Sequence, residues 1–108
     1  MDATAEVARE YRSDLRTVLG ATLRAKPHAW RLLNADGRSV RCLVLADGPG
    51  LRAGQRVYVA LSALETGTVV RIDGAGDELD APARHELRLF LDQVALELAG
   101  GSEGVLGG

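Results

Sequence analysis

Aromatic, cysteine and histidine residues are scarce in this sequence. Aromatic side chains make up 4% of its 108 residues, and it has one cysteine and two histidines. The lone Cys42 excludes an internal disulfide framework, so we expect a reducing compartment. His28 and His85 belong to no HxH, HExxH or CxxC pattern. The sequence therefore predicts no catalytic residues, no metal site and no cofactor.

Long apolar runs are also absent. No stretch approaches the roughly 18 apolar residues that are needed to cross a bilayer. The first residues, 1–4, have neither the basic segment nor the apolar run of a secretion signal. We therefore expect no membrane partner, and a protein that resides in the cytoplasm or in a virion and is not secreted through a signal peptide.

The composition that remains is that of one globular domain spanning 1–108, with 46% apolar and 26% charged residues. Charge is distributed unevenly along it. Residues 20–73 have eight basic residues against four acidic ones, whereas 74–108 have two against seven. A basic middle can mark a surface for an acidic partner, or an acidic flank can cover it within one molecule.

The first segment, 2–19, has the pattern of an amphipathic helix. Val7, Tyr11, Leu15 and Val18 recur at spacings of four, four and three, which places them on one helical face. Gly20 follows as a natural helix end.

Residues 20–73 change to short apolar runs separated by turn residues, which is typical of a small antiparallel sheet or barrel. The clearest turn is 34–37, Asn-Ala-Asp-Gly, because Asn and Asp bond their own backbone and Gly accepts positive φ. We expect five strands, at 21–25, 30–33, 39–46, 55–61 and 67–72.

Two elements have apolar residues on both sides. In strand 39–46, every second residue belongs to one apolar face. Leu43 and Leu45 point to the opposite side of the strand, so that side is also largely apolar. A second helix is predicted over 81–99, before a flexible tail at 100–108, and Leu89 and Leu96 lie opposite its main apolar stripe. We expect the face with Leu43 and Leu45 to be covered by the terminal helices or by a partner subunit. Leu89 and Leu96 are either solvated or a contact surface for protein partners or further copies of the chain.

The order of motifs in 20–72 resembles an OB-fold domain of the bacterial initiation-factor-one type. The segments are GATLRAKPHAWRLL at 20–33, DGRSVRC at 36–42, LRAGQRVYVAL at 51–61 and GTVVRI at 67–72. The chain departs from that family in its short, glycine-rich loop after 46 and in its two flanking helices. The resemblance implies a barrel that binds oligonucleotides on its second and third strands. The residues that would do so are Trp30, as a stacking platform, with Arg31, Arg38 and Arg41.

The sequence therefore predicts a mainly β fold, a five-stranded antiparallel barrel of OB-like or SH3-like topology, flanked by an N-terminal and a C-terminal helix. The absence of catalytic motifs and the two-sided apolar elements favour a non-enzymatic assembly subunit, for example a bacteriophage virion component. Its interface residues would be Leu43, Leu45, Leu89 and Leu96. The alternative hypothesis is a single-stranded nucleic-acid-binding protein.

Overall fold

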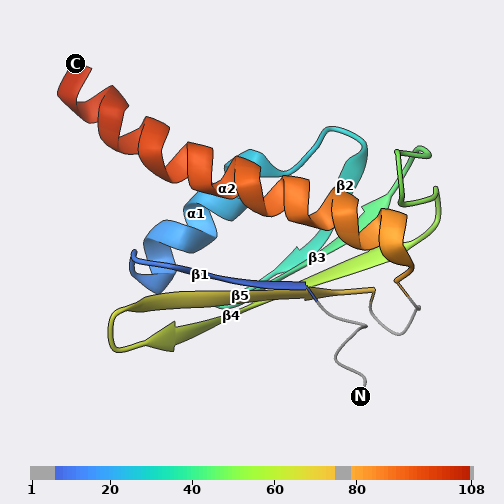
Figure 1. The fold of residues 1–108 in the computed structure, drawn as a ribbon, viewed down its shortest axis with the longest axis horizontal. Coiled ribbons are helices and arrows are strands. Elements are labelled where there is room, and N and C mark those ends of the chain that lie inside the picture. The colour runs from blue at the N-terminus through green and yellow to red at the C-terminus, as the bar shows by residue number, and fades with distance from the viewer. Residues whose placement is uncertain (1–6, 75–78, 108) are drawn as a thin grey trace.

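The computed structural model describes the backbone of residues 7–74 and 79–107, and the side chains as far as residue 100. It contains one sheet and two helices (Figure 1). In chain order, the elements are β1 (Val7–Tyr11), α1 (Leu15–Ala25), β2 (Trp30–Ala35), β3 (Ser39–Val44), β4 (Arg56–Leu64), β5 (Gly67–Asp73) and α2 (Ala81–Gly107).

The sheet is open, so the predicted closure into a barrel is wrong. Its five strands are all antiparallel and lie in the order β1-β5-β4-β3-β2, which leaves β1 and β2 as opposite edges. Both helices lie on the same side of the sheet (Figure 1). The apolar face of each strand is therefore covered by helices, and the sheet does not need to curl around its own interior.

Residues 7–25 differ most from the prediction, and residues 2–6 of the predicted first helix lie outside the described part of the chain. A strand, β1, occupies part of the predicted helix 2–19, and α1 begins later and runs through Gly20. The spacing between Val7 and Tyr11 is a multiple of two as well as about one helical turn, so it also fits one face of a strand. Asp14 starts α1, because its Oδ1 accepts a hydrogen bond from the Thr17 N–H at 2.9 Å.

The predicted strand at 21–25 is instead the second half of α1. Ala21, Thr22 and Ala25 are buried on the side of α1 that faces the core. The Thr22 hydroxyl donates a hydrogen bond to the Val18 carbonyl at 2.8 Å, so this β-branched residue is satisfied within the helix. The other four predicted strands correspond to β2–β5, with ends that differ by up to three residues.

The turn between β2 and β3 is confirmed at the predicted position. The Asp36 carboxylate accepts hydrogen bonds from the Arg38 N–H at 2.9 Å and the Ser39 hydroxyl at 3.0 Å. These bonds favour the ionised carboxylate, so they lower the pKa of Asp36, with the Arg38 N–H as the largest cause. The register of β2 shifts between Leu32 and Asn34, so Leu33 lies in a bulge.

Helix α2 begins as predicted but ends later. Asp80 accepts a hydrogen bond from the Ala83 N–H at 3.0 Å at the start of the helix. The helix continues to Gly107, through the region that the sequence assigned to a tail. Glu86 fastens the loop before β4 to this helix, because its Oε1 accepts from the N–H groups of Gly50 and Leu51, both at 2.7 Å.

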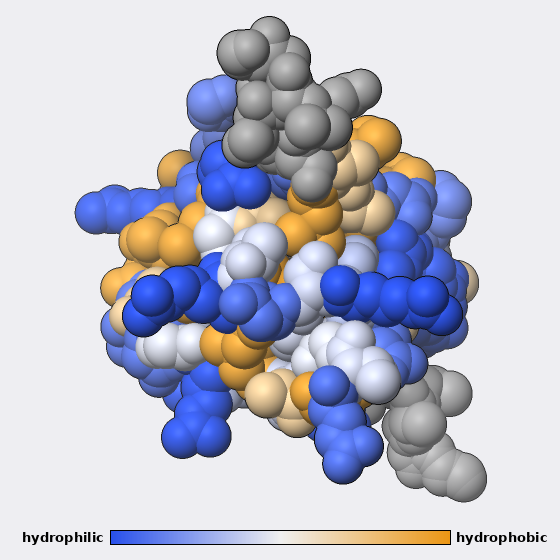
Figure 2. Space-filling view, turned by 90° about the vertical axis from the view of Figure 1, so that its left-hand side faces the viewer, coloured by the Kyte–Doolittle hydropathy of each residue, from blue (hydrophilic) through white to orange (hydrophobic). Residues whose placement is uncertain are grey.

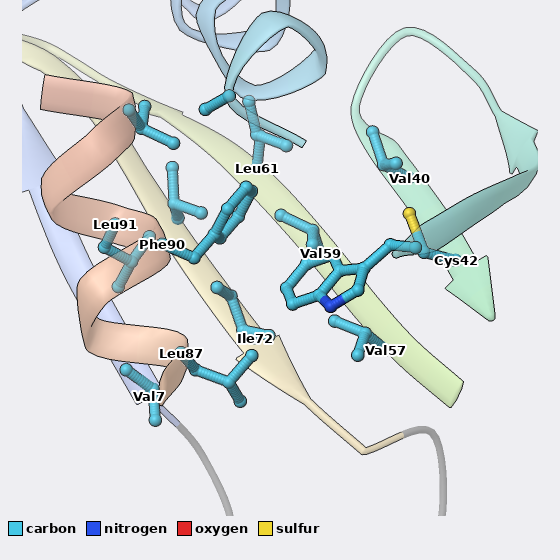
Figure 3. Packing of buried hydrophobic residues seen from close by; sticks show 14 of the residues in the cluster. Val7, Val40, Cys42, Val57, Val59, Leu61, Ile72, Leu87, Phe90 and Leu91 are labelled. Carbon is cyan, nitrogen blue, oxygen red and sulfur yellow. The ribbon is translucent and has the colours of Figure 1, made fainter. Parts of the chain in front are cut away.

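The core lies between the helices and the sheet. Trp30 of β2 is 2% exposed and packs against Phe90 of α2, with ring centroids 4.9 Å apart. Figure 3 shows Phe90 projecting from α2 toward Val59 and Leu61 of β4. All of these residues belong to a single cluster that draws on both helices and all five strands. The packing therefore fixes α2 across the sheet and makes one rigid body.

Tyr11 joins β1 to α2 through a buried hydrogen bond. Its hydroxyl donates to the Leu91 carbonyl at 2.7 Å. Burial is the main reason that the pKa of Tyr11 is raised from 10.0 to about 12.

We expect Tyr11→Phe to lower the free energy of unfolding by about 1 kcal/mol at neutral pH, because it removes this hydrogen bond. The folded-state pKa of Tyr11 lies above its unfolded value, so its stabilising contribution is complete below pH 10.0 and is lost as the pH rises toward about 12. Urea unfolding at a series of pH values should therefore show the wild type approaching the variant above pH 10.0. A difference that stays constant over that range would contradict the assignment.

Candidate functional site

The face of the sheet opposite the helices is the candidate functional site, and we call it the open face. Strand alternation assigns residues to it, because neighbours of buried residues point to the other side. No described helix or strand packs on it. The open face consists of Ala8, Glu10, Arg31, Asn34, Ser39, Arg41, Leu43, Arg56, Tyr58, Ala60, Ser62, Val69, Arg71 and Asp73.

Arginine is the dominant charged residue on the open face. Arg31, Arg41, Arg56 and Arg71 are all exposed, against the two carboxylates of Glu10 and Asp73. Leu43 pairs with Arg31 on one side and with Arg56 on the other. Figure 2 shows the end of the molecule that lies on the left in Figure 1, where hydrophilic side chains project outward with apolar ones between them.

Arginines on the two sides of the sheet differ in their partners. On the helix side, Arg9 contacts Asp92 at 2.6 Å and Arg24 contacts Glu97 at 3.2 Å. Within residues 7–74 and 79–100, no carboxylate lies at ion-pair distance from Arg31, Arg56 or Arg71. The open face therefore presents guanidinium groups whose charge the described part of the fold does not neutralise.

A cleft of about 530 Å³ lies on the open face between β2 and the end of β5. The guanidinium of Arg41 stands 5.1 Å from the centre of the Tyr58 ring, so one side of that ring is already occupied by a cation. The bulge of β2 places Leu33 at the cleft. The cleft is lined by Leu33, Asn34, Arg41, Cys42, Arg56, Val57, Tyr58 and Asp73.

The four predicted interface leucines lie on two sides of the molecule. Leu43 is half-buried on the open face, and Leu45, which is 52% exposed, follows it on the same side. Leu89 and Leu96 are 48% and 62% exposed on the side of α2 opposite its buried residues, and Leu89 also lines a concavity with Trp30 and Pro49. The four leucines therefore form two separate surfaces, and Leu33, 49% exposed, adds to the first of them.

The four predicted nucleic-acid residues are not brought together. Arg31 and Arg41 share the open face, next to Leu43. Trp30 is buried against Phe90, so the prediction that it offers a stacking platform is wrong. Arg38 is exposed but lines a different concavity, with Leu15 of α1, because it has the strand parity of the helix side.

The sequence prediction missed several residues of this site, among them Arg56, Arg71 and Leu33. The first two could have been found, because alternation in 55–61 and 67–72 separates them from the buried valines of their strands. Leu33 could not have been found, because the side of the sheet on which it lies depends on the bulge in β2. No residue of that strand indicates a bulge in the sequence.

The chemistry of the remaining candidates is limited. Among the residues that the structure describes, no three His, Cys, Asp or Glu side chains gather to hold a metal ion. No described helix is long and apolar enough to span a bilayer. Cys42 is 2% exposed, and burial raises the pKa of its thiol.

We expect Cys42 to be unreactive in the folded protein, because the thiolate is the reactive form and both burial and the raised pKa suppress it. Ellman's reagent at pH 8 should label no thiol until denaturant unfolds the chain. Rapid labelling of the native protein would show that Cys42 is accessible and would contradict its place in the core.

Comparison with known proteins gives no relative for this chain. No protein-family model, curated protein or solved structure matches it. Function must therefore be argued from the open face and from the outer side of α2.

Proposed function

We propose that this protein is a non-enzymatic assembly subunit that contacts neighbouring proteins through surfaces on opposite sides of one rigid body. The observation that carries the proposal is the exposure of large apolar side chains in two places. Leu33 and Leu45 are about half exposed at the open face, and Leu89 and Leu96 are so on α2.

The energetic argument is that water leaves these side chains when a neighbour covers them. Full burial of a leucine side chain is worth about 1.5 to 3 kcal/mol, so covering one that is half exposed contributes about 1 kcal/mol. Two such leucines on each surface therefore make a modest contribution to the free energy of association. Polar complementarity with the neighbour must supply the rest.

The placement of the two surfaces supports a role in assembly. A subunit with one contact surface forms pairs, whereas a subunit with two can join two neighbours at once. The core holds α2 and the sheet in a fixed relation, so neighbours bound on the two sides would also stand in a fixed relation.

Single-stranded nucleic-acid binding is the second candidate function. Arg31 and Arg41 favour it, because both stand exposed on the same face as Arg56 and Arg71. The burial of Trp30 leaves Tyr58 as the aromatic residue of that face, with Arg41 over its ring. We therefore rank it below protein binding.

The native mass in solution tests the proposed function. We expect light scattering after size-exclusion chromatography to give a mass above the 11.4 kDa of one chain. The double variant Leu89→Glu/Leu96→Glu should lower this mass while the separated chain remains folded by circular dichroism, because both side chains are exposed in the single chain.

The matched control is Ala95→Glu/Ala99→Glu, which adds the same charge at two other exposed positions of α2. It should leave the mass unchanged. A wild type that remains a single chain at every concentration, with no effect of the leucine substitutions, would overturn the proposal.

A further inference from the structure

We propose that the open face binds an acidic polypeptide segment that also carries apolar side chains. This inference rests on the proposed role as an assembly subunit and names the chemistry of one neighbour. It is carried by the juxtaposition, on a single face of the sheet, of leucines with arginines that have no carboxylate partner among the described residues.

Charge complementarity is the first argument. Arg31, Arg56 and Arg71 have no carboxylate partner in the described part of the chain, whereas Arg9 and Arg24 on the helix side do. Covering these guanidinium groups with an uncharged surface would remove water from them without replacing its hydrogen bonds. A partner that brings carboxylates replaces those bonds, and it does so with charge-assisted ones.

The leucines decide between classes of anionic partner. Leu43 lies between Arg31 and Arg56 in the sheet register, and Leu45 follows it on the same side. A sugar-phosphate backbone offers little apolar surface to cover these side chains, whereas a polypeptide can place a large apolar side chain between two acidic ones. Arginine, tyrosine and apolar residues together are also the composition enriched at the cores of protein interfaces.

The spacing of the arginines fits this pattern. Arg31 and Arg56 stand on β2 and β4, two strands apart, so their backbones are separated by about 10 Å. Leu43 of β3 occupies the position midway between them. A segment lying across these strands would set carboxylates over the two arginines and an apolar side chain over Leu43.

A second copy of the chain bound face to face fits less well. Two-fold pairing would bring two copies of the same patch together, and this patch has four arginines against two carboxylates, so both partners would be positively charged. Like charges brought together without counterions destabilise a contact. The occupant is therefore a segment of opposite charge.

Fluorescence anisotropy with defined probes tests the inference. The first probe is a labelled peptide in which leucines stand between glutamates. The second peptide has serine in place of each leucine, and the third probe is labelled oligothymidylate of the same net charge. We expect the leucine-containing peptide to bind most tightly at low salt, with an affinity that falls as salt screens the arginines.

Two double variants locate the site. Arg41→Ala/Arg56→Ala should weaken binding of the leucine-containing peptide about tenfold or more. The control, Arg16→Ala/Arg88→Ala, removes the same charge from exposed positions on the two helices and should leave binding unchanged. Both variants should retain the wild-type unfolding temperature, because all four side chains are exposed.

Three results would overturn the inference: tighter binding of oligothymidylate than of either peptide, no binding of the leucine-containing peptide at low salt, or equal losses in the two double variants. Native mass, measured on the same samples, separates this failure from that of the proposed function. If the peptide fails to bind while the mass exceeds that of one chain, only the partner chemistry is wrong. If the mass is that of one chain as well, both proposals fail.

Discussion

The packing of α2 across the sheet is the contact on which the rest of the structure depends. Phe90 meets Trp30, and the same helix supplies the carbonyl that accepts the Tyr11 hydroxyl. These contacts tie α2 to β1 and β2, the two edges of the sheet. Because α2 and α1 occupy the same side, the packing also determines which face is left for a partner.

One consequence is that the two sides of each strand differ in composition and exposure. Most side chains toward the helices are apolar and buried, and Arg9 of β1 and Arg24 of α1 on that side are paired with acidic residues of α2. On the open face, arginines alternate with partly exposed apolar residues. Leu43 and Leu45 lie among those arginines and add apolar surface to a charged face, which is why we propose this face for binding.

The sequence predicts the meander of β2–β5 well, because turn residues separate the strands and the turn at Asp36 is fixed by its own side chain. It fails for residues 7–25. The spacing of Val7 and Tyr11 fits a helix and a strand equally, and Gly20 is tolerated inside α1. The packing of β1 against β5 and α2 makes this segment a strand. That packing cannot be predicted from the local sequence pattern.

The candidate site was predictable only in part. Alternation places Arg31, Arg41 and Leu43 on one face, but it cannot say whether a helix covers that face. The predicted role of Trp30 failed for the same reason, since its burial depends on Phe90, 60 residues away along the chain. Whether the strands close into a barrel or form an open sheet depends on which strands become edges. Long-range strand pairing determines this, so the sequence pattern alone does not.

The measurement that tests the central claim most directly is amide chemical-shift mapping by NMR as the acidic, leucine-containing peptide is added to the labelled protein. Our account predicts that the perturbed amides cluster on β2, β3 and β4 around Arg31, Leu43 and Arg56. Perturbations confined to the outer side of α2, or none at all at low salt, would contradict it.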